Sequence, residues 1–215
     1  MKKPLFLTSE RIKFIKRRII LPIILVHIVL SVAATFRNNY IKSNKYAAVL
    51  ISDRAISRYD YWASPLAFIG AYPYWTYYFN NRGYKTEWFL RAKSTDLNNI
   101  IQDERFESLV LVGHGSFNSW QAVDKLVTNE DVKIMMVGKK RKIGEWIQLT
   151  CAVEDTSPIK IGQLVMEKPD KVYTYDNSVN TFIFVTDALF GFKYLKSISN
   201  SRKVENNYGT NNVTK

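Results

Sequence analysis

The 215-residue sequence is poor in the side chains that most often bind metals or act as nucleophiles. It contains one cysteine, Cys151, and two histidines, His27 and His114. A single cysteine excludes an internal disulfide, and with so little histidine a zinc site of the Cys/His type is not expected. No segment has the carboxylate spacing of a calcium-binding loop. The composition therefore predicts neither a metal ion nor any other cofactor.

Acidic residues are almost absent from the N-terminal part of the chain, and this asymmetry accounts for most of the net charge of +12. Residues 1–45 hold ten of the 31 lysines and arginines but one of the 19 acidic residues. The other 170 residues carry 21 basic and 18 acidic side chains, which is close to balance. A nucleic-acid surface needs positive charge on the folded part of a protein. The distribution instead favours a membrane-topology signal, and no nucleic-acid partner is expected.

Charge is missing altogether from the run Ile19–Phe36. As a helix this run would be about 27 Å long, close to the ~30 Å hydrocarbon core of a bilayer. Residues 1–18, which precede it, carry seven basic residues and one acid. The positive-inside rule then predicts a single-pass membrane protein with residues 1–18 in the cytoplasm and the rest of the chain outside it.

A cleaved signal peptide is the alternative interpretation of this N-terminus. The segment Ser31–Ala34 offers the small residues that a signal peptidase requires. The basic segment and the apolar run are each 18 residues, however, and both are long for a signal peptide. An uncleaved signal anchor is therefore favoured.

After a polar spacer, residues 37–44, short apolar runs alternate with helical segments. The runs predicted to be strands are 46–51, 86–90, 108–112, 145–150 and 172–175. Short continuous apolar runs are typical of parallel strands that are covered on both faces. We therefore predict an α/β domain over residues 45–196, a three-layer sandwich with a mostly parallel central sheet. The tail, residues 197–215, is polar and predicted to be disordered.

Helices are predicted between the strands, within residues 55–81 and over 94–105, 132–137 and 159–168. The first of these segments is rich in aromatic residues. Pro73 is expected to break or kink the helix there, because proline lacks the N–H that an interior helical position donates. Asn80–Gly83 is a typical helix stop.

Two of the predicted strands lead into residues that could do chemistry. Ser108–Val112 is followed by Gly113-His114-Gly115, and Trp146–Thr150 is followed by Cys151. Reacting groups gather at the carboxyl ends of strands in an open α/β sheet, and a thiol with an imidazole supplies the nucleophile and base of a cysteine hydrolase. Two non-catalytic interpretations stay open: a buried, inert Cys151 and a His114 that only caps a loop.

The two motifs, in this order and 37 residues apart, resemble those of the caspase-like clan of cysteine peptidases. That clan includes caspases, legumains, gingipains and CHAT-domain proteases. The resemblance covers residues 45–195, and within it Trp120 and a helix over Leu126–Val132 would lie between the two motifs. It implies a caspase-like three-layer fold for this domain.

The resemblance also implies roles for individual residues. Cys151 would attack a peptide carbonyl, and His114 would protonate the leaving amine. The backbone N–H groups of Gly115 and Cys151 would hold the oxyanion. The loop Asp176-Asn177-Ser178 would line the pocket for the residue before the scissile bond, and its carboxylate would favour Lys or Arg.

The sequence thus predicts a membrane-anchored, caspase-like cysteine peptidase that acts on peptide or protein substrates outside the cytoplasm. The alternative is a catalytically inactive, membrane-tethered interaction module of the same fold, with the aromatic stretch Tyr59–Phe79 as its binding face. An α/β-hydrolase is excluded because the chain has no Gly-x-Ser-x-Gly nucleophile motif.

Overall fold

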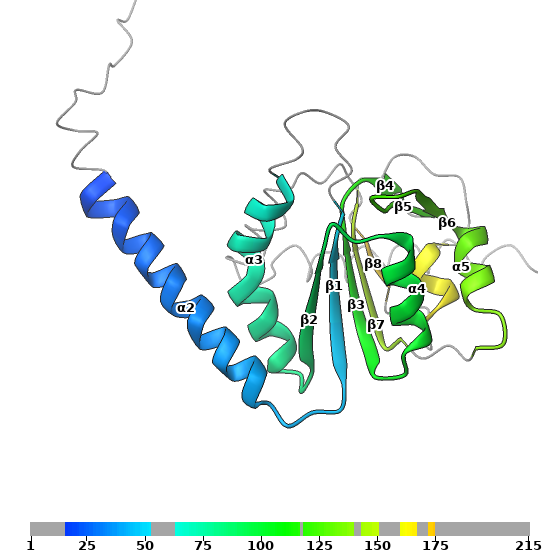
Figure 1. Ribbon diagram of the computed structural model, residues 1–215, viewed down its shortest axis with the longest axis horizontal. Helices are drawn as coiled ribbons and strands as arrows, with labels where there is room; N and C mark the ends of the chain where they lie inside the picture. Colours follow the sequence, from blue (N-terminus) through cyan, green and yellow to red (C-terminus); the bar gives the residue numbers. More distant parts are fainter. Residues whose placement is uncertain are drawn as a thin grey trace, which may run out of the picture.

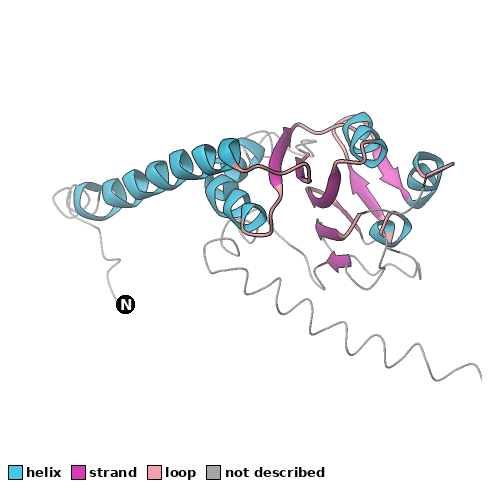
Figure 2. Cartoon of the chain, turned by 90° about the horizontal axis from the view of Figure 1, so that it is seen from below, coloured by secondary structure: helices cyan, strands magenta, loops and turns pink. Residues whose placement is uncertain are grey.

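The computed structural model describes residues 16–52, 63–116, 118–139, 143–150, 160–166 and 172–174. Within these residues the chain forms a twisted sheet with helices on both faces, and a long N-terminal helix lies outside one of the helical layers (Figure 1). Seen at right angles, the N-terminal end of this helix projects away from the rest of the molecule, whereas its C-terminal end lies beside α3 (Ala63–Asn80) (Figure 2).

Among the described residues, five strands form the central sheet, in the order β2-β1-β3-β7-β8. Their bounds are β1 Tyr46–Ile51, β2 Lys85–Leu90, β3 Phe106–Val112, β7 Glu145–Leu149 and β8 Val172–Thr174. Each neighbouring pair is parallel. The predicted α/β class with a mostly parallel sheet is therefore confirmed.

Helices bury both faces of this sheet. Helix α3 (Ala63–Asn80) covers one face, and α4 (Ser94–Gln102), α5 (Asn129–Met135) and the 3-10 turn η3 (Ile161–Leu164) cover the other (Figure 1). Along β1, Val49 packs in the α3 layer and Leu50 in the α4 layer. Because both faces are buried, β1 and residues 109–112 of β3 are continuous apolar runs rather than alternating ones, as the sequence indicated. The edge strand β2 is less buried and carries Lys85 and Glu87.

A second, small antiparallel sheet lies beside the carboxyl ends of the main strands and was not predicted. It comprises β4 (Gly115–Ser116), β5 (Ser119–Gln121) and β6 (Leu126–Thr128). Strands of two or three residues are too short to show a hydrophobic period.

The helix expected over Leu126–Val132 was therefore wrong in its first turn. The chain stays extended to Thr128, and α5 begins at Asn129. Thr128 caps α5, accepting a bond from Asp131 N, while its own N–H donates to the Asp131 carboxylate at 2.8 Å. This reciprocal pair is a capping box, which fixes where the helix starts.

Helix α3 continues through Pro73 without interruption, so the expected break is wrong. A proline at this position removes the bond that would reach the carbonyl of residue 69. His27 Nε2, on the N-terminal helix, lies 2.7 Å from the Ile69 carbonyl oxygen and bonds to it instead. The polar group that the proline leaves unpaired is satisfied from outside the helix, and the helix continues.

The N-terminal apolar helix is confirmed and is longer than predicted. A π-helical turn, η1 (Lys16–Ile20), leads into α2 (Leu21–Tyr40), four residues past the expected end at Phe36. The segment expected to be a spacer, 37–44, thus begins inside the helix.

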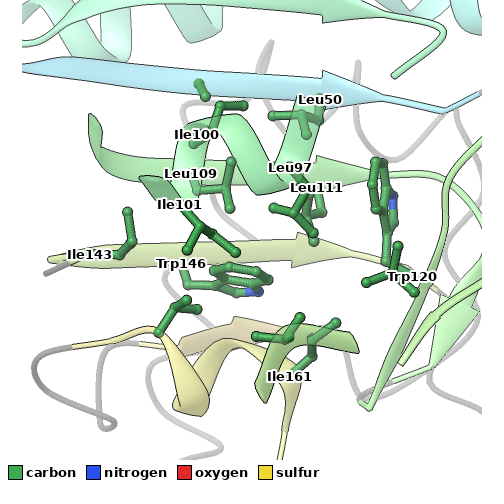
Figure 3. Close-up of a cluster of buried hydrophobic side chains, with 14 of the residues drawn as sticks. Leu50, Leu97, Ile100, Ile101, Leu109, Leu111, Trp120, Ile143, Trp146 and Ile161 are labelled. Atoms are coloured by element: carbon green, nitrogen blue, oxygen red, sulfur yellow. The ribbon is translucent and has the colours of Figure 1, made fainter. Parts of the chain in front are cut away.

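The larger part of the core lies between the sheet and the α4, α5 and η3 layer (Figure 3). Trp146 of β7 is fully buried there. Gly162 of η3 lies directly on its indole, where an added Cβ would come within 2.5–2.8 Å of ring atoms. The helix expected over 159–168 is this single 3-10 turn within the described residues 160–166, because Met166 already bridges to Ile143.

Replacing Gly162 should therefore destabilise the domain. A methyl group in Gly162→Ala meets a rigid, enclosed ring, and overpacking of this kind costs about 1–3 kcal/mol of unfolding free energy. Urea unfolding of the detergent-solubilised protein measures the loss. Gly144→Ala is the matched control, because its nearest neighbour, the Glu107 carbonyl oxygen, lies at an ordinary 3.5 Å. Equal stabilities of the two variants would contradict this account of the packing.

Candidate functional site

The carboxyl ends of β1, β3 and β7 meet at one edge of the sheet. From β1 the chain crosses through α3 to β2 on one side, and from β2 it returns through α4 to β3 on the other. Open α/β sheets commonly bind ligands beside such a reversal of strand order, which lies here between β1 and β3. Ser52, just past β1, and Gly113, just past β3, face each other at this position: Ser52 N donates to the Val112 carbonyl at 3.0 Å.

Two glycines with positive φ hold His114 between them. Gly113 has φ +143°, and a Cβ on it would collide with the Ser52 hydroxyl. Gly115 has φ +150°, and a Cβ there would collide with the Ser119 carbonyl. Only glycine fits both positions, and His114 is carried on this tight turn with its side chain exposed.

The backbone of this turn is continued into the β4–β5 hairpin. Gln121 N donates to the His114 carbonyl at 2.8 Å, next to the Gly115–Trp120 pair. That bond makes Gly115 and Trp120 a non-hydrogen-bonded pair of the antiparallel ladder. The N–H of Gly115 consequently points away from β5, an orientation compatible with the predicted role as an oxyanion donor.

Gln148, buried on β7, ties the hairpin to the main sheet. Its Nε2 donates to the carbonyl oxygens of Ser116 and Ser119 and to Thr150 Oγ1. Its Oε1 accepts a bond from the indole N–H of Trp146 at 3.3 Å. The hydrogen-bonding groups of one buried amide thus join the hairpin to β7.

Trp120 and Asp124 add two further attachments. The buried Trp120 indole N–H donates to the Val112 carbonyl at 3.3 Å, at the very end of β3. The Asp124 carboxylate accepts from the N–H of Ser94 at 2.7 Å and from its hydroxyl. Partial desolvation acts to raise the pKa of Asp124, but these bonds outweigh it and hold the pKa below its usual value. The hairpin that follows His114 is therefore fixed to β3, β7 and α4.

Strand β7 brings its own end alongside this turn. Val112 pairs with Leu149, and Gly113 N donates to the Leu149 carbonyl at 3.4 Å. Thr150 is buried, and its hydroxyl lies 3.4 Å from the Ser116 carbonyl, to which it donates. The ends of β3 and β7 are thus in direct contact up to Thr150.

The predicted site residues divide into two groups. His114 and Gly115 lie at the carboxyl edge, as the strand pattern indicated. Cys151 and the predicted pocket residues Asp176, Asn177 and Ser178 lie outside the described residues. In the part of the chain that is described, no group of three or more His, Cys, Asp or Glu side chains could hold a metal ion.

Sequence reasoning assigned no role to Gln148, Thr150 or Ser52, and it named Trp120 only as a residue between the two motifs. The first two carried a usable signal, since a buried amide and hydroxyl in an apolar strand must find partners. Nothing local in the sequence marks the other two. Their roles depend on β1 and β5 lying beside β3.

No protein-family model matches the sequence, and no curated protein matches it. The function must therefore be argued from the residues and their geometry.

Loss of the Gln148 amide should loosen the hairpin. Gln148→Ala leaves two backbone carbonyls and the Trp146 indole N–H without this partner, and each buried unsatisfied group costs about 1–3 kcal/mol. We expect a drop of that order in unfolding free energy, measured by urea denaturation, and faster proteolytic cleavage within residues 114–121. Gln121→Ala, which removes a single half-buried bond to the Ala122 carbonyl, should cost less. A Gln148 variant no less stable than the Gln121 variant would show that the amide does not hold the hairpin.

Proposed function

We propose that the chain is a membrane-anchored cysteine peptidase of the caspase-like type, with His114 and Cys151 as its catalytic dyad. One observation carries the proposal. Val112 of β3 and Leu149 of β7 are register partners on adjacent parallel strands. His114 comes two residues after Val112 in the sequence, and Cys151 comes two residues after Leu149. The one cysteine and the one histidine outside the apolar helix thus share the same offset from a paired position.

The proposed reaction is transfer of an acyl group to sulfur. The Cys151 thiol gives its proton to His114, and its sulfur attacks the carbonyl carbon of a peptide bond. The carbonyl oxygen becomes an oxyanion held by the N–H groups of Gly115 and Cys151. The C–N bond then breaks, and His114 donates a proton to the leaving amine. Water attacks the thioester, releasing the carboxylic acid and restoring the thiol and the imidazole.

The architecture around His114 supports such a role. An oxyanion donor must be oriented before the substrate arrives, since fixed dipoles need no reorganisation in the transition state. The Gly115 N–H points away from β5, and the hairpin that carries it is held by Gln148 and Trp120. The exposure of His114 leaves its ring accessible to a substrate.

For substrates we propose peptides or proteins outside the cytoplasm, with Lys or Arg before the scissile bond if Asp176 lies in the pocket. Among the described residues, Arg17–Tyr40 is a helix long and apolar enough to cross a membrane. The seven basic residues ahead of its uncharged run, Ile19–Phe36, support an orientation with the domain on the extracytoplasmic side.

The dyad predicts a reactive Cys151. An imidazole that stabilises the thiolate raises its fraction near neutral pH above that of a free cysteine with a pKa of about 8.5. A thiol-directed electrophile at pH 6.5 should therefore modify Cys151 at least about tenfold faster in the folded protein than in urea. His114→Ala should remove this difference, and His27→Ala should keep it.

Mass spectrometry of the intact protein over time follows the modification. A folded-state rate equal to or below the rate in urea would remove the peptidase proposal, and the inactive interaction module would then be the better account. With a panel of fluorogenic peptides, Cys151→Ala and His114→Ala should each lose essentially all hydrolysis, because nucleophile and acid act as one unit.

The membrane orientation is tested separately. Protease added to intact cells should digest the domain and leave a fragment that contains the residues up to the membrane helix. A tag before residue 1 should be protected, and a tag after residue 215 should be lost. Protection of the C-terminal tag until the cells are permeabilised would show that the orientation is reversed.

A further inference from the structure

The N-terminal helix does not stand apart from the domain. Helices α2 and α3 lie side by side, and α3 lies between the sheet and all of α2 except its C-terminal end (Figure 1). His27 reaches the carbonyl of Ile69, and eight residues further along α2 the Thr35 hydroxyl lies 2.9 Å from that of Tyr72. The contacts advance along both helices together, so α2 and α3 run in the same direction.

The two helices share a boundary between apolar and polar residues. Helix α3 contains no charged residue, and the run Ile19–Phe36 contains none either. Immediately after these stretches, Arg37 donates to Asn81 at 2.6 Å, and Asn80 donates to Asn38 at 2.9 Å. The polar side chains at the C-terminal ends of α2 and α3 thus bond to one another, at the same height along the two helices.

Asn38 also attaches this level to the sheet. Its side-chain amide accepts from Thr86 N at 2.7 Å and donates to the Thr86 carbonyl at 3.0 Å. Thr86 lies on β2, an edge strand, so the amide covers backbone groups that the edge would otherwise expose. The end of α2 is therefore fastened to the domain.

The hydrogen bond between His27 and the Ile69 carbonyl stabilises the helix pair more in lipid than in water. Pro73 leaves the Ile69 carbonyl without a partner from α3 itself. In hydrocarbon no water can replace the missing bond, and prolines in membrane helices are tolerated where a neighbouring helix supplies one. His27 supplies it here, from the middle of the apolar run of α2.

The part of α2 ahead of its contacts with α3 is too short to cross a membrane alone. Any membrane span must therefore include the part that contacts α3. Helix ahead of His27, from Lys16 to Val26, would cover about 16 Å, roughly half of the hydrocarbon thickness. A full span needs residues beyond His27, and these are the residues that contact α3. Either α3 meets the bilayer together with α2, or α2 must leave α3 to cross it.

The outer face of α3 is apolar, as expected if α3 meets the bilayer together with α2. Leu66 and Ile69 are 65% and 57% exposed, similar to Val29 of α2 at 66%. Ala67, Ala71 and Trp75 of the same helix are buried against the sheet. One side of α3 thus packs on the domain, and the other presents aliphatic side chains beside α2 with no charge among them.

We propose that α3 is a second membrane-contacting element, with Leu66 and Ile69 against the acyl chains of the bilayer beside α2. The inference rests on the membrane anchor of the proposed function and adds to it. The domain is seated on the bilayer through α3, and it is not held away from the bilayer by a spacer.

The depth of single sites in proteoliposomes tests this proposal. In the full chain with Cys151→Ser, the variants Leu66→Cys, Ile69→Cys, Val29→Cys and Ile134→Cys each carry the fluorophore NBD. Phosphatidylcholine with nitroxide-labelled acyl chains then quenches label that reaches the hydrocarbon. Ile134 of α5 is the matched control, because it is 72% exposed but lies on the opposite side of the sheet.

We expect quenching at Leu66 and Ile69 within about twofold of that at Val29, and at least fivefold more than at Ile134. Two α3 positions are used so that a perturbation at one does not decide the result. Quenching at Val29 with none at either α3 position would overturn the inference and leave the anchor standing. Quenching at none of the three would remove the anchor itself, and the inference with it.

Discussion

Burial of the parallel sheet on both faces is the constraint from which the rest of the structure follows. Helix α3 covers one face, and α4, α5 and η3 cover the other, so side chains along β1, β3 and β7 must be apolar on both sides. Polar and reactive groups then have room only where the strands end. The turn with His114 and the exit of β7 toward Cys151 both occupy such ends. The register between β3 and β7 fixes the distance between the points where the chain leaves these two strands.

The buried polar groups near that edge of the sheet hold the hairpin in place. Gln148 is a polar side chain within the core, and desolvating its amide is costly unless its hydrogen bonds are made. Its partners are the hairpin carbonyls after His114, so the bonds that satisfy the amide also hold the hairpin against β7. Trp120 contributes in the same way from the hairpin side, through the last carbonyl of β3. The position of the His114 turn is thus a result of hydrogen-bond satisfaction deep in the protein.

A similar exchange of hydrogen bonds joins the N-terminal helix to the domain. Pro73 creates an unpaired carbonyl on α3, His27 of α2 meets it, and Asn38 closes the exposed edge of β2. In each bond, a side chain of α2 pairs with a backbone group that α3 or β2 cannot pair within itself. The sequence presented the aromatic stretch Tyr59–Phe79 as a possible binding face. In its described part, residues 63–79, Trp75 and Phe79 fill the core, and Tyr72 and Tyr77 contact α2.

The sequence by itself determined the α/β class, the five strands and the apolar helix, because continuous short runs of apolar residues and an uncharged 18-residue run depend on local composition alone. It also indicated that His114 follows a strand, since Gly113 and Gly115 mark a turn whatever surrounds it. Tertiary structure alone decided the rest. The small sheet β4–β5–β6 has no local period, and the continuity of α3 through Pro73 required a histidine 46 residues away in the chain. The roles of Gln148 and Asn38 were equally hidden, because a buried amide reveals only that it needs partners, and which backbone groups it meets is set by the packing of distant segments.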